Sequence, residues 1–171
     1  MNIRKIDIQG IDIKKAALTA AKAALIIFLI VFLILLMTRE SVKDVSADKI
    51  NDQMCSIKSI AALHKGTDKS LLKYYDLTGD DYDGYVMYKS GSPMSVEELL
   101  IIKTKDDKQR TAVESAMRRH VRSQISSFEG YGTTQIALLE AKILDAEGPY
   151  VFLAVSEDAE KWKKKFDEII N

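Results

Sequence analysis

The chain has 171 residues, of which 47% are hydrophobic and 29% are charged, with one cysteine, two prolines and eight glycines. This composition excludes a disordered tail, a collagen and a small disulfide-rich domain. Basic and acidic residues number 25 each, so the net charge is zero, but the charges are unevenly placed. Residues 1–22 have a net charge of +3, residues 23–38 carry no charge, and residues 40–171 have a net charge of −4. The chain therefore divides into parts of different chemistry.

The uncharged stretch predicts a membrane-spanning helix. Leu25 to Met37 contains only Leu, Ile, Val, Phe and Met. Extended back to Ala16, the apolar segment has about 22 residues, and a spanning helix needs about 20. We therefore expect a cytoplasmic basic N-terminus at 1–15 and a transmembrane signal anchor at 16–38.

The flanking charges predict the orientation of this anchor. Basic residues are in excess before the segment, so the positive-inside rule places the N-terminus in the cytoplasm and the C-terminal domain outside the cell. A signal peptide cleaved after Ala47 is the alternative. The long, charged interval from Thr38 to Ala47 favours the uncleaved anchor, which makes this a single-pass protein of the cell membrane.

The residues after the anchor predict a short polar stalk at 39–46 and one extracytoplasmic domain at 47–171. Its first half shows helical spacing of apolar residues, followed by runs rich in aromatic and branched side chains. The expected elements are helices over 47–63 and 69–75 and strands over 85–88 and 99–102.

The second half of the domain is dominated by a long amphipathic helix over 107–128. A short helix from Thr133 or Thr134 to Leu139 and a hairpin of strands over 142–146 and 150–155 follow, and then a final helix capped by Ser156. The order α-α-β-β-α-α-β-β-α predicts an α+β domain, with an antiparallel sheet of about four strands and helices on one face.

Catalytic and metal-binding motifs are scarce in this sequence. The chain has two histidines, His64 and His120, no Gly-x-Ser-x-Gly motif, and one cysteine, Cys55, without basic neighbours. No zinc-ligand spacing occurs, and the acidic run at 80–84 fails the calcium-loop pattern. We expect no metal and no small-molecule cofactor. An outer domain with a net negative charge also argues against nucleic acid as a partner.

Basic residues on the long helix give a second candidate for chemistry. Arginine binds phosphate or carboxylate through two parallel hydrogen bonds. The helix carries four: Arg110, Arg118, Arg119 and Arg122. The alternative is a solvated face, partly neutralised by Glu114 and Glu129.

Six stretches of the chain form a recognisable series: 73–77 (KYYDL), 85–88 (YVMY), 95–103 (SVEELLIIK), 124–131 (QISSFEGY), 135–139 (QIALL) and 148–153 (GPYVFL). Their order and spacing resemble a bacterial family catalogued as a domain of unknown function. The resemblance covers residues 45–170. It implies a protein of Gram-positive, clostridia-like bacteria. Members of the family tend to be lipoproteins or single-pass anchored proteins with the domain outside the cell.

This chain departs from the family pattern in two ways. Members carry Arg four residues before the Gln of the fourth stretch, where this chain has His120 beside Arg119. Many members use a lipid anchor, for which this chain substitutes the predicted transmembrane helix. The resemblance implies an envelope location and carries no known activity.

We therefore expect a non-enzymatic accessory domain that binds an envelope protein or a cell-wall polymer. The candidate ligand-binding residues are Glu98, Lys103, Arg119, Gln124 and Tyr131. A competing hypothesis is an envelope hydrolase or transferase that uses His120 with a nearby carboxylate. A third is a structural subunit whose alanine-rich membrane helix packs against a partner.

Overall fold

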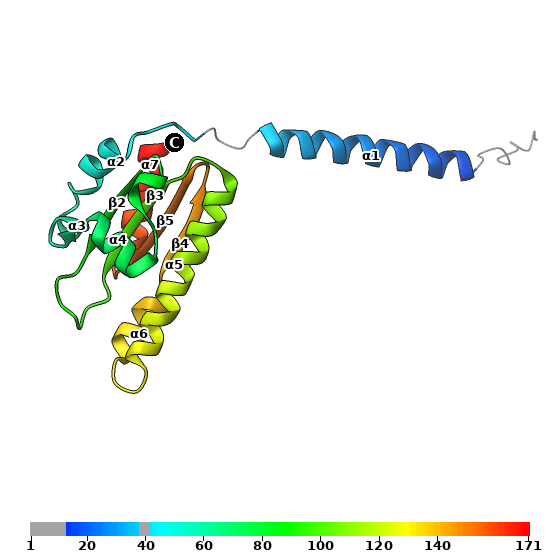
Figure 1. Ribbon diagram of the computed structural model, residues 1–171. Helices are drawn as coiled ribbons and strands as arrows, with labels where there is room; N and C mark the ends of the chain where they lie inside the picture. The colour runs from blue at the N-terminus through cyan, green and yellow to red at the C-terminus, as the bar shows by residue number, and fades with distance from the viewer. Residues whose placement is uncertain (1–12, 38–41) are drawn as a thin grey trace, which may run out of the picture. The chain divides into compact units, whose positions relative to one another are not determined.

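The computed structural model describes residues 13–37 and 42–171, which fall into two compact units (Figure 1). The first unit contains one helix, α1 (Ile13–Met37). The second is the domain at the C-terminal side. Most of the predicted basic N-terminus and the first part of the predicted stalk lie outside the described residues.

Helix α1 carries exposed apolar side chains along its middle. Leu18 and all residues from Leu25 to Phe32 are between 48% and 69% exposed. Within the residues that the structure describes, no helix combines the length and the apolarity needed to cross a membrane.

The domain follows the predicted order of elements, apart from a divided first helix, an added edge strand and an added 3-10 helix. Its helices are α2 (Ala47–Met54), α3 (Lys58–Ala61), α4 (Asp68–Tyr75), the 3-10 helix η1 (Gly79–Asp81), α5 (Asp107–Phe128), α6 (Thr133–Glu140) and α7 (Ala159–Ile170). Its strands are β1 (His64–Lys65), β2 (Gly84–Lys89), β3 (Glu98–Lys103), β4 (Ile143–Glu147) and β5 (Tyr150–Val155). The domain is therefore of the α+β class, as predicted.

The sheet in the described residues has five strands in the order β1-β2-β3-β5-β4, and all neighbours are antiparallel. The prediction of about four strands missed β1, where His64 pairs with Lys89. A two-residue edge strand shows no alternation of apolar and polar residues, so the sequence carries no periodic signal for it.

Helices cover both faces of the sheet, which corrects the predicted single covered face (Figure 1). In β3, Leu99 and Ile101 pack with α2, α3 and α7, whereas Leu100 and Ile102 pack with α4, α5 and α6. Strand β5 is buried at every position. Because successive side chains of a strand point to opposite faces, a strand buried throughout requires cover on both sides.

The first predicted helix, over 47–63, is interrupted in the structure. Helix α2 ends at Met54, and Ile57 adopts an extended conformation (φ −78°, ψ 121°) before α3. Ser56 donates a hydrogen bond to the carbonyl oxygen of Gln53 at 2.6 Å, and such local bonds compete with regular helix. The extended Ile57 keeps its side chain in the core at 9% exposure.

The last predicted helix starts later than the sequence suggested. Ser156 Oγ accepts the Asp158 backbone N–H at 3.2 Å, so the hydroxyl closes a turn before the helix. Helix α7 then begins at Ala159, with Asp158 as its N-cap residue. The bounds of α5 agree with the predicted 107–128, and Asp106 Oδ1 caps it by accepting the Gln109 N–H at 2.7 Å.

Residues 42–46, predicted as part of the stalk, contact the domain. The Lys43 backbone N–H donates to the Ile170 carbonyl oxygen at 2.7 Å. The Tyr150 hydroxyl accepts the Val45 backbone N–H at 2.7 Å, and Val45 is only 7% exposed.

Candidate functional site

A buried carboxylate marks the start of the central strand β3. Glu98 is 1% exposed and lies on the same face of the sheet as Leu100 and Ile102, the face that helices α4 and α5 cover. Alternation along the strand places it there. A charge in such an apolar layer is costly unless partners compensate it.

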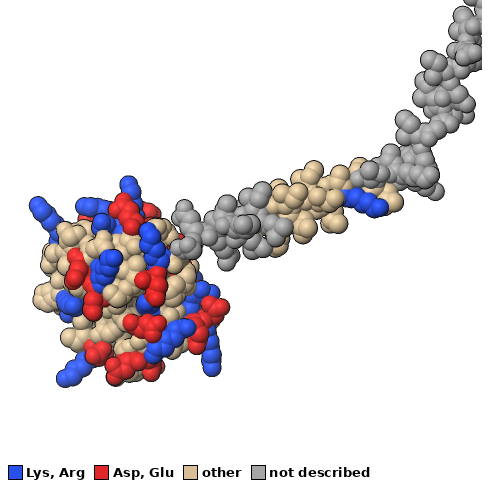
Figure 2. All heavy atoms as spheres, turned by 90° about the horizontal axis from the view of Figure 1, so that it is seen from above, with Lys and Arg blue, Asp and Glu red and all other residues tan. Residues whose placement is uncertain are grey.

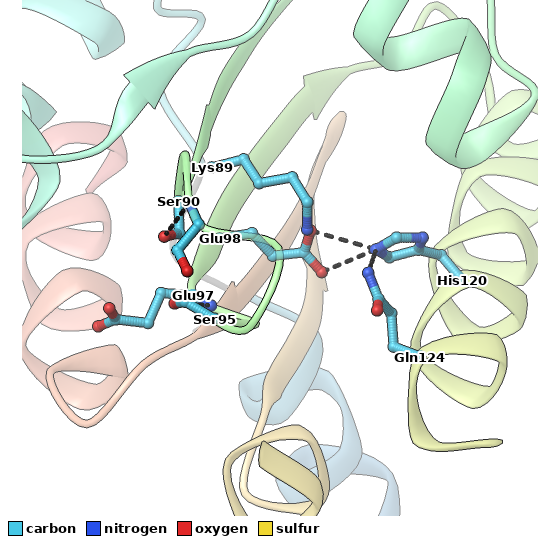
Figure 3. Close-up of polar contacts among 8 residues, drawn as sticks. Lys89, Ser90, Ser95, Glu97, Glu98, His120 and Gln124 are labelled. Carbon is cyan, nitrogen blue, oxygen red and sulfur yellow. Dashed lines mark hydrogen bonds and ion pairs between the residues drawn. The ribbon is translucent and has the colours of Figure 1, made fainter. Parts of the chain in front are cut away.

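Two cationic or hydrogen-bonding partners reach Glu98 from different elements (Figure 3). Lys89 stands opposite Glu98 in the β2–β3 register, and its Nζ lies 2.9 Å from Glu98 Oε2. His120, from α5, places Nε2 3.0 Å from Oε1 and 3.1 Å from Oε2. The carboxylate therefore has a hydrogen-bond partner for each oxygen.

The contact with Glu98 fixes the proton on the His120 ring. An ionised carboxylate only accepts hydrogen bonds, so His120 Nε2 must carry the hydrogen and donate it. Gln124 Nε2 lies 3.5 Å from His120 Nε2. Two N–H groups do not bond to each other, so this amide makes only van der Waals contact in that tautomer. The second ring nitrogen, Nδ1, lies on the side of the ring away from Glu98 (Figure 3).

The partners of Glu98 keep it ionised. Burial by itself raises the pKa of Glu98, but the hydrogen bond and charge of His120, together with Lys89, outweigh burial and hold the pKa below its ordinary value. The cluster of Glu98, His120 and Lys89 is therefore a compensated buried charge.

A fourth buried polar group lies beside this cluster. The Tyr75 ring centroid is 4.4 Å from that of His120, and the Tyr75 hydroxyl has no hydrogen-bond partner among the described residues. Burial, then the negative charge of Glu98, and then the approach of the hydroxyl to that carboxylate raise the pKa of Tyr75, so the phenol stays neutral. The hydroxyl therefore lies toward Glu98, although the contact falls short of a hydrogen bond of good geometry.

A surface pocket of about 210 Å³ opens between α4 and α5, next to these groups. We call it the α4–α5 pocket. His120 and Tyr75 are its buried members, whereas Arg119 and Lys73 are exposed. Its lining residues are Lys73, Tyr74, Tyr75, Asp76, Ala116, Arg119, His120 and Ser123.

The structure brings three of the five predicted ligand-binding residues to this region. Glu98 and Gln124 contact His120, and Arg119 lines the pocket with it. Lys89 of the cluster and the neighbouring Tyr75 were not among the predicted site residues. Strand alternation could have indicated Lys89, because it places residues 85, 87 and 89 on one face.

The other two predicted residues lie elsewhere. Lys103 ends β3, five residues and about 17 Å from Glu98, and it belongs to the opposite face of the sheet. It forms an ion pair with Asp44, whose hydrogen bond raises the pKa of Lys103. Tyr131 is 65% exposed beyond the end of α5, where its hydroxyl donates to the Ser127 carbonyl oxygen at 2.6 Å.

The four arginines of α5 do not form one patch. Arg110 donates to the Gly148 carbonyl oxygen at 2.9 Å, and Arg118 pairs with Glu114 at 3.6 Å. Of the four, Arg119 is the one that lines the α4–α5 pocket. On the face of the domain shown in Figure 2, basic and acidic side chains are interspersed.

The described residues offer little for catalysis beyond the His120–Glu98 contact. No hydrogen bond joins His120 Nδ1 to a hydroxyl within the described part of the chain. Across residues 13–37 and 42–171, no group of three His, Cys, Asp or Glu side chains is placed to hold a metal ion.

Comparison with known proteins identifies the family. No curated protein and no solved structure matches this chain. A family model described as "Domain of unknown function (DUF4358)" matches residues 57–156, which is more than half of the chain and includes the whole buried cluster. The chain therefore belongs to this family, as the order of its sequence stretches predicted.

Proposed function

We propose that this chain is a membrane-anchored, extracytoplasmic accessory domain of a bacterial cell envelope, and that it binds its partner without catalysing a reaction. The partner is an envelope protein or a cell-wall polymer, and the α4–α5 pocket is the binding site. The observation that carries the binding role is the compensated buried charge beneath this pocket.

The anchor in this proposal is the segment at 16–38. Its support is the uncharged run from Ala23 to Thr38 and the exposure of the apolar side chains from Leu25 to Phe32. Removing such side chains from water is favourable, and a lipid phase would supply the apolar surroundings. The excess of basic residues before the segment supports the outward orientation of the domain.

The α4–α5 pocket is a better binding site than the larger hollows of the domain. The hollow of about 300 Å³ at the start of α5 contains Arg110, which is already held by Gly148 and by Asp107 at 3.0 Å. A hollow of about 310 Å³ is lined by the carboxylates of Glu97 and Glu157 but by no basic residue. The α4–α5 pocket combines exposed cations with buried polar groups.

The hydrolase or transferase hypothesis remains the second candidate because of one contact. A carboxylate that holds a histidine in one tautomer is also how many enzymes orient a general base. Here Lys89 shares Glu98, and His120 Nδ1 makes no hydrogen bond to a hydroxyl among the described residues. These features favour a structural role for the pair.

Site-specific crosslinking in intact cells tests the binding role. The full-length chain would carry a photoreactive residue in place of Ser123, which lines the pocket, or in place of Lys164, which is exposed on α7. We expect a defined adduct from position 123 that is absent from position 164 and is weakened by Arg119→Gln. Adducts from both positions alike, or none from position 123, would contradict the proposal.

A hydrolysis assay separates the second candidate from the first. The full-length chain would be incubated with purified cell-wall polymer, and newly released amino groups and reducing ends would be counted. The binding proposal predicts no release above background. Release that disappears in His120→Gln would replace it with the hydrolase hypothesis.

A further inference from the structure

We propose that the α4–α5 pocket binds a phosphate group carried by a larger ligand. This inference rests on the proposed binding role of the pocket and names the chemistry it recognises. It depends on one juxtaposition: the Arg119 guanidinium, the Lys73 ammonium and the Ser123 hydroxyl line a pocket of about 210 Å³ that also contains buried His120.

The two exposed cations at the pocket are available for a ligand. Within the described residues, neither Arg119 nor Lys73 forms an ion pair, and Arg119 Nη1 donates only to Ser115 Oγ at 3.1 Å. The neighbouring Arg118, by contrast, is paired with Glu114. An unpaired guanidinium next to a hollow can donate hydrogen bonds to an oxyanion bound there.

The charges around the pocket sum in favour of an anion. Two ammonium groups approach the Tyr74 ring, Lys73 at 5.0 Å and Lys89 at 5.2 Å from its centroid. Lys89 compensates the buried Glu98, and Asp76 at the rim offsets one of the two exposed cations. Without counting His120, one positive charge remains in excess.

The arrangement of donors favours phosphate over carboxylate. Arg119 and Ser123 come from α5, whereas Lys73 and Tyr74 come from α4, so the donors approach from two walls. The two coplanar oxygens of a carboxylate are satisfied by one guanidinium, whereas a tetrahedral phosphate presents oxygens in several directions. At about 210 Å³, the pocket is smaller than those that enclose whole small molecules, so it suits a single group of a larger ligand.

One buried polar atom gives further support for a missing group. His120 donates Nε2–H to Glu98, which leaves Nδ1 as an acceptor for a protonated phosphate oxygen. The buried Tyr75 side chain lines the same pocket, with its hydroxyl toward Glu98. A buried polar atom without a partner marks a place where an additional ligand or water belongs.

The test is a titration of the full-length chain in non-ionic detergent with inorganic phosphate at constant ionic strength. The readout is the side-chain ¹⁵N signals of the two histidines, because His64 is exposed on β1 and serves as an internal control. We expect the His120 signals to shift with a dissociation constant on the order of 1 mM. The His64 signals should stay in place.

Matched variants identify the residues responsible. Arg119→Gln should weaken phosphate binding about tenfold, because it removes a charge-assisted hydrogen bond. Arg118→Gln, one residue earlier on the same helix, should change it by less than about twofold, because its exposed pair with Glu114 contributes little. Equal weakening by both variants would mean that phosphate responds to general charge, and would overturn the proposal.

Titrations with three other compounds distinguish the possible sources of the phosphate group from each other and from a carboxylate. Glycerol 3-phosphate stands for a polyol-phosphate polymer, vesicles of phosphatidylglycerol stand for a lipid headgroup, and acetate stands for a carboxylate. A His120 shift with glycerol 3-phosphate or with the vesicles supports the phosphate site and identifies its source. A shift with acetate at the same concentration as with phosphate would overturn phosphate selectivity.

The outcome is distinguishable from that of the crosslinking experiment. If no phosphate compound shifts His120 but the Arg119-dependent adduct from position 123 persists, the pocket binds a different chemistry and only the phosphate inference fails. If phosphate shifts His120 and Arg119→Gln weakens both phosphate binding and the adduct, both proposals are supported.

Discussion

His120 Nε2 lies 3.0 Å and 3.1 Å from the two carboxylate oxygens of Glu98, and both side chains are more than nine-tenths buried. This contact ties the long helix α5 to the first residue of the central strand β3. Lys89, from the neighbouring strand β2, completes the compensation of the charge. The geometry of the α4–α5 pocket depends on this link, because His120 belongs to both the cluster and the pocket.

The first prediction concerns the tautomer of His120. Because Glu98 accepts the Nε2–H, the neutral form of the ring should carry its hydrogen on Nε2. Long-range ¹H–¹⁵N correlation spectra of the imidazole rings measure this directly. Glu98→Leu should release the ring to a mixture of both neutral tautomers. A hydrogen found on Nδ1 of His120 in the native chain would contradict the geometry.

The second prediction is a loss of stability in acid. Because the pKa of Glu98 is lower in the folded state than its ordinary value of 4.5, the ionised group stabilises the fold above that value. This stabilisation is lost as the pH falls below 4.5 and through the folded-state pKa. Urea unfolding as a function of pH measures the effect. Glu98→Gln should show a shallower acid dependence, and an identical slope in both proteins would remove Glu98 as the cause.

The third prediction separates buried from exposed ion pairs. The side chains of Lys89 and Lys103 are similarly covered, at 15% and 14% exposure, but their partners Glu98 and Asp44 are 1% and 85% exposed. Lys89→Met should lower the free energy of unfolding by about 3 kcal/mol, because it leaves a buried carboxylate less compensated. Lys103→Met should cost less than about 1 kcal/mol.

Denaturant unfolding of the two lysine variants, at neutral pH, is the measurement. The double variant Lys89→Met with Glu98→Gln should recover part of the loss, because the uncompensated charge is then gone. A loss for Lys103→Met as large as that for Lys89→Met would refute the distinction between the two pairs.

The fourth prediction tests the cover on both faces of the sheet. Leu100 faces α4 and α5, and Ile101 faces α2 and α7, and each is at most 2% exposed. Replacing either with Ala should cost about 2–5 kcal/mol, because each leaves a cavity in a packed layer. Thermal and urea unfolding give the values. A cost under about 1 kcal/mol for one of them would mean that its face is open to solvent.

Much of the fold can be predicted from the sequence because most of its elements have a local signal. The periodicity of 107–128 fixed the helix α5, and the turn at Gly148, which adopts a positive φ of 55°, separated the strands of the hairpin. The division of 47–63 into α2 and α3 was missed, because the apolar residues keep helical spacing in the sequence across Ile57, although Ile57 itself is extended. The edge strand β1 was missed because two residues carry no pattern.

The candidate site could be predicted only in part, because its contacts are long-range. Glu98 and His120 were each singled out, but nothing local shows which carboxylate would lie beside the imidazole 22 residues away. The position of Lys89 opposite Glu98 depends on the register between β2 and β3, and the sequence of the loop between these strands does not determine that register. Lys103 was wrongly grouped with Glu98: it comes five positions later in the strand, and because side chains alternate, an odd offset places the two on opposite faces.

The location of the domain is the claim on which the proposed function depends most. Fusing alkaline phosphatase and, separately, green fluorescent protein after Asn171 of the full-length chain measures it directly. The account predicts an active phosphatase and a dark fluorescent protein, and the reverse on deletion of residues 16–38. A fluorescent, phosphatase-inactive fusion of the intact chain would contradict an extracytoplasmic domain.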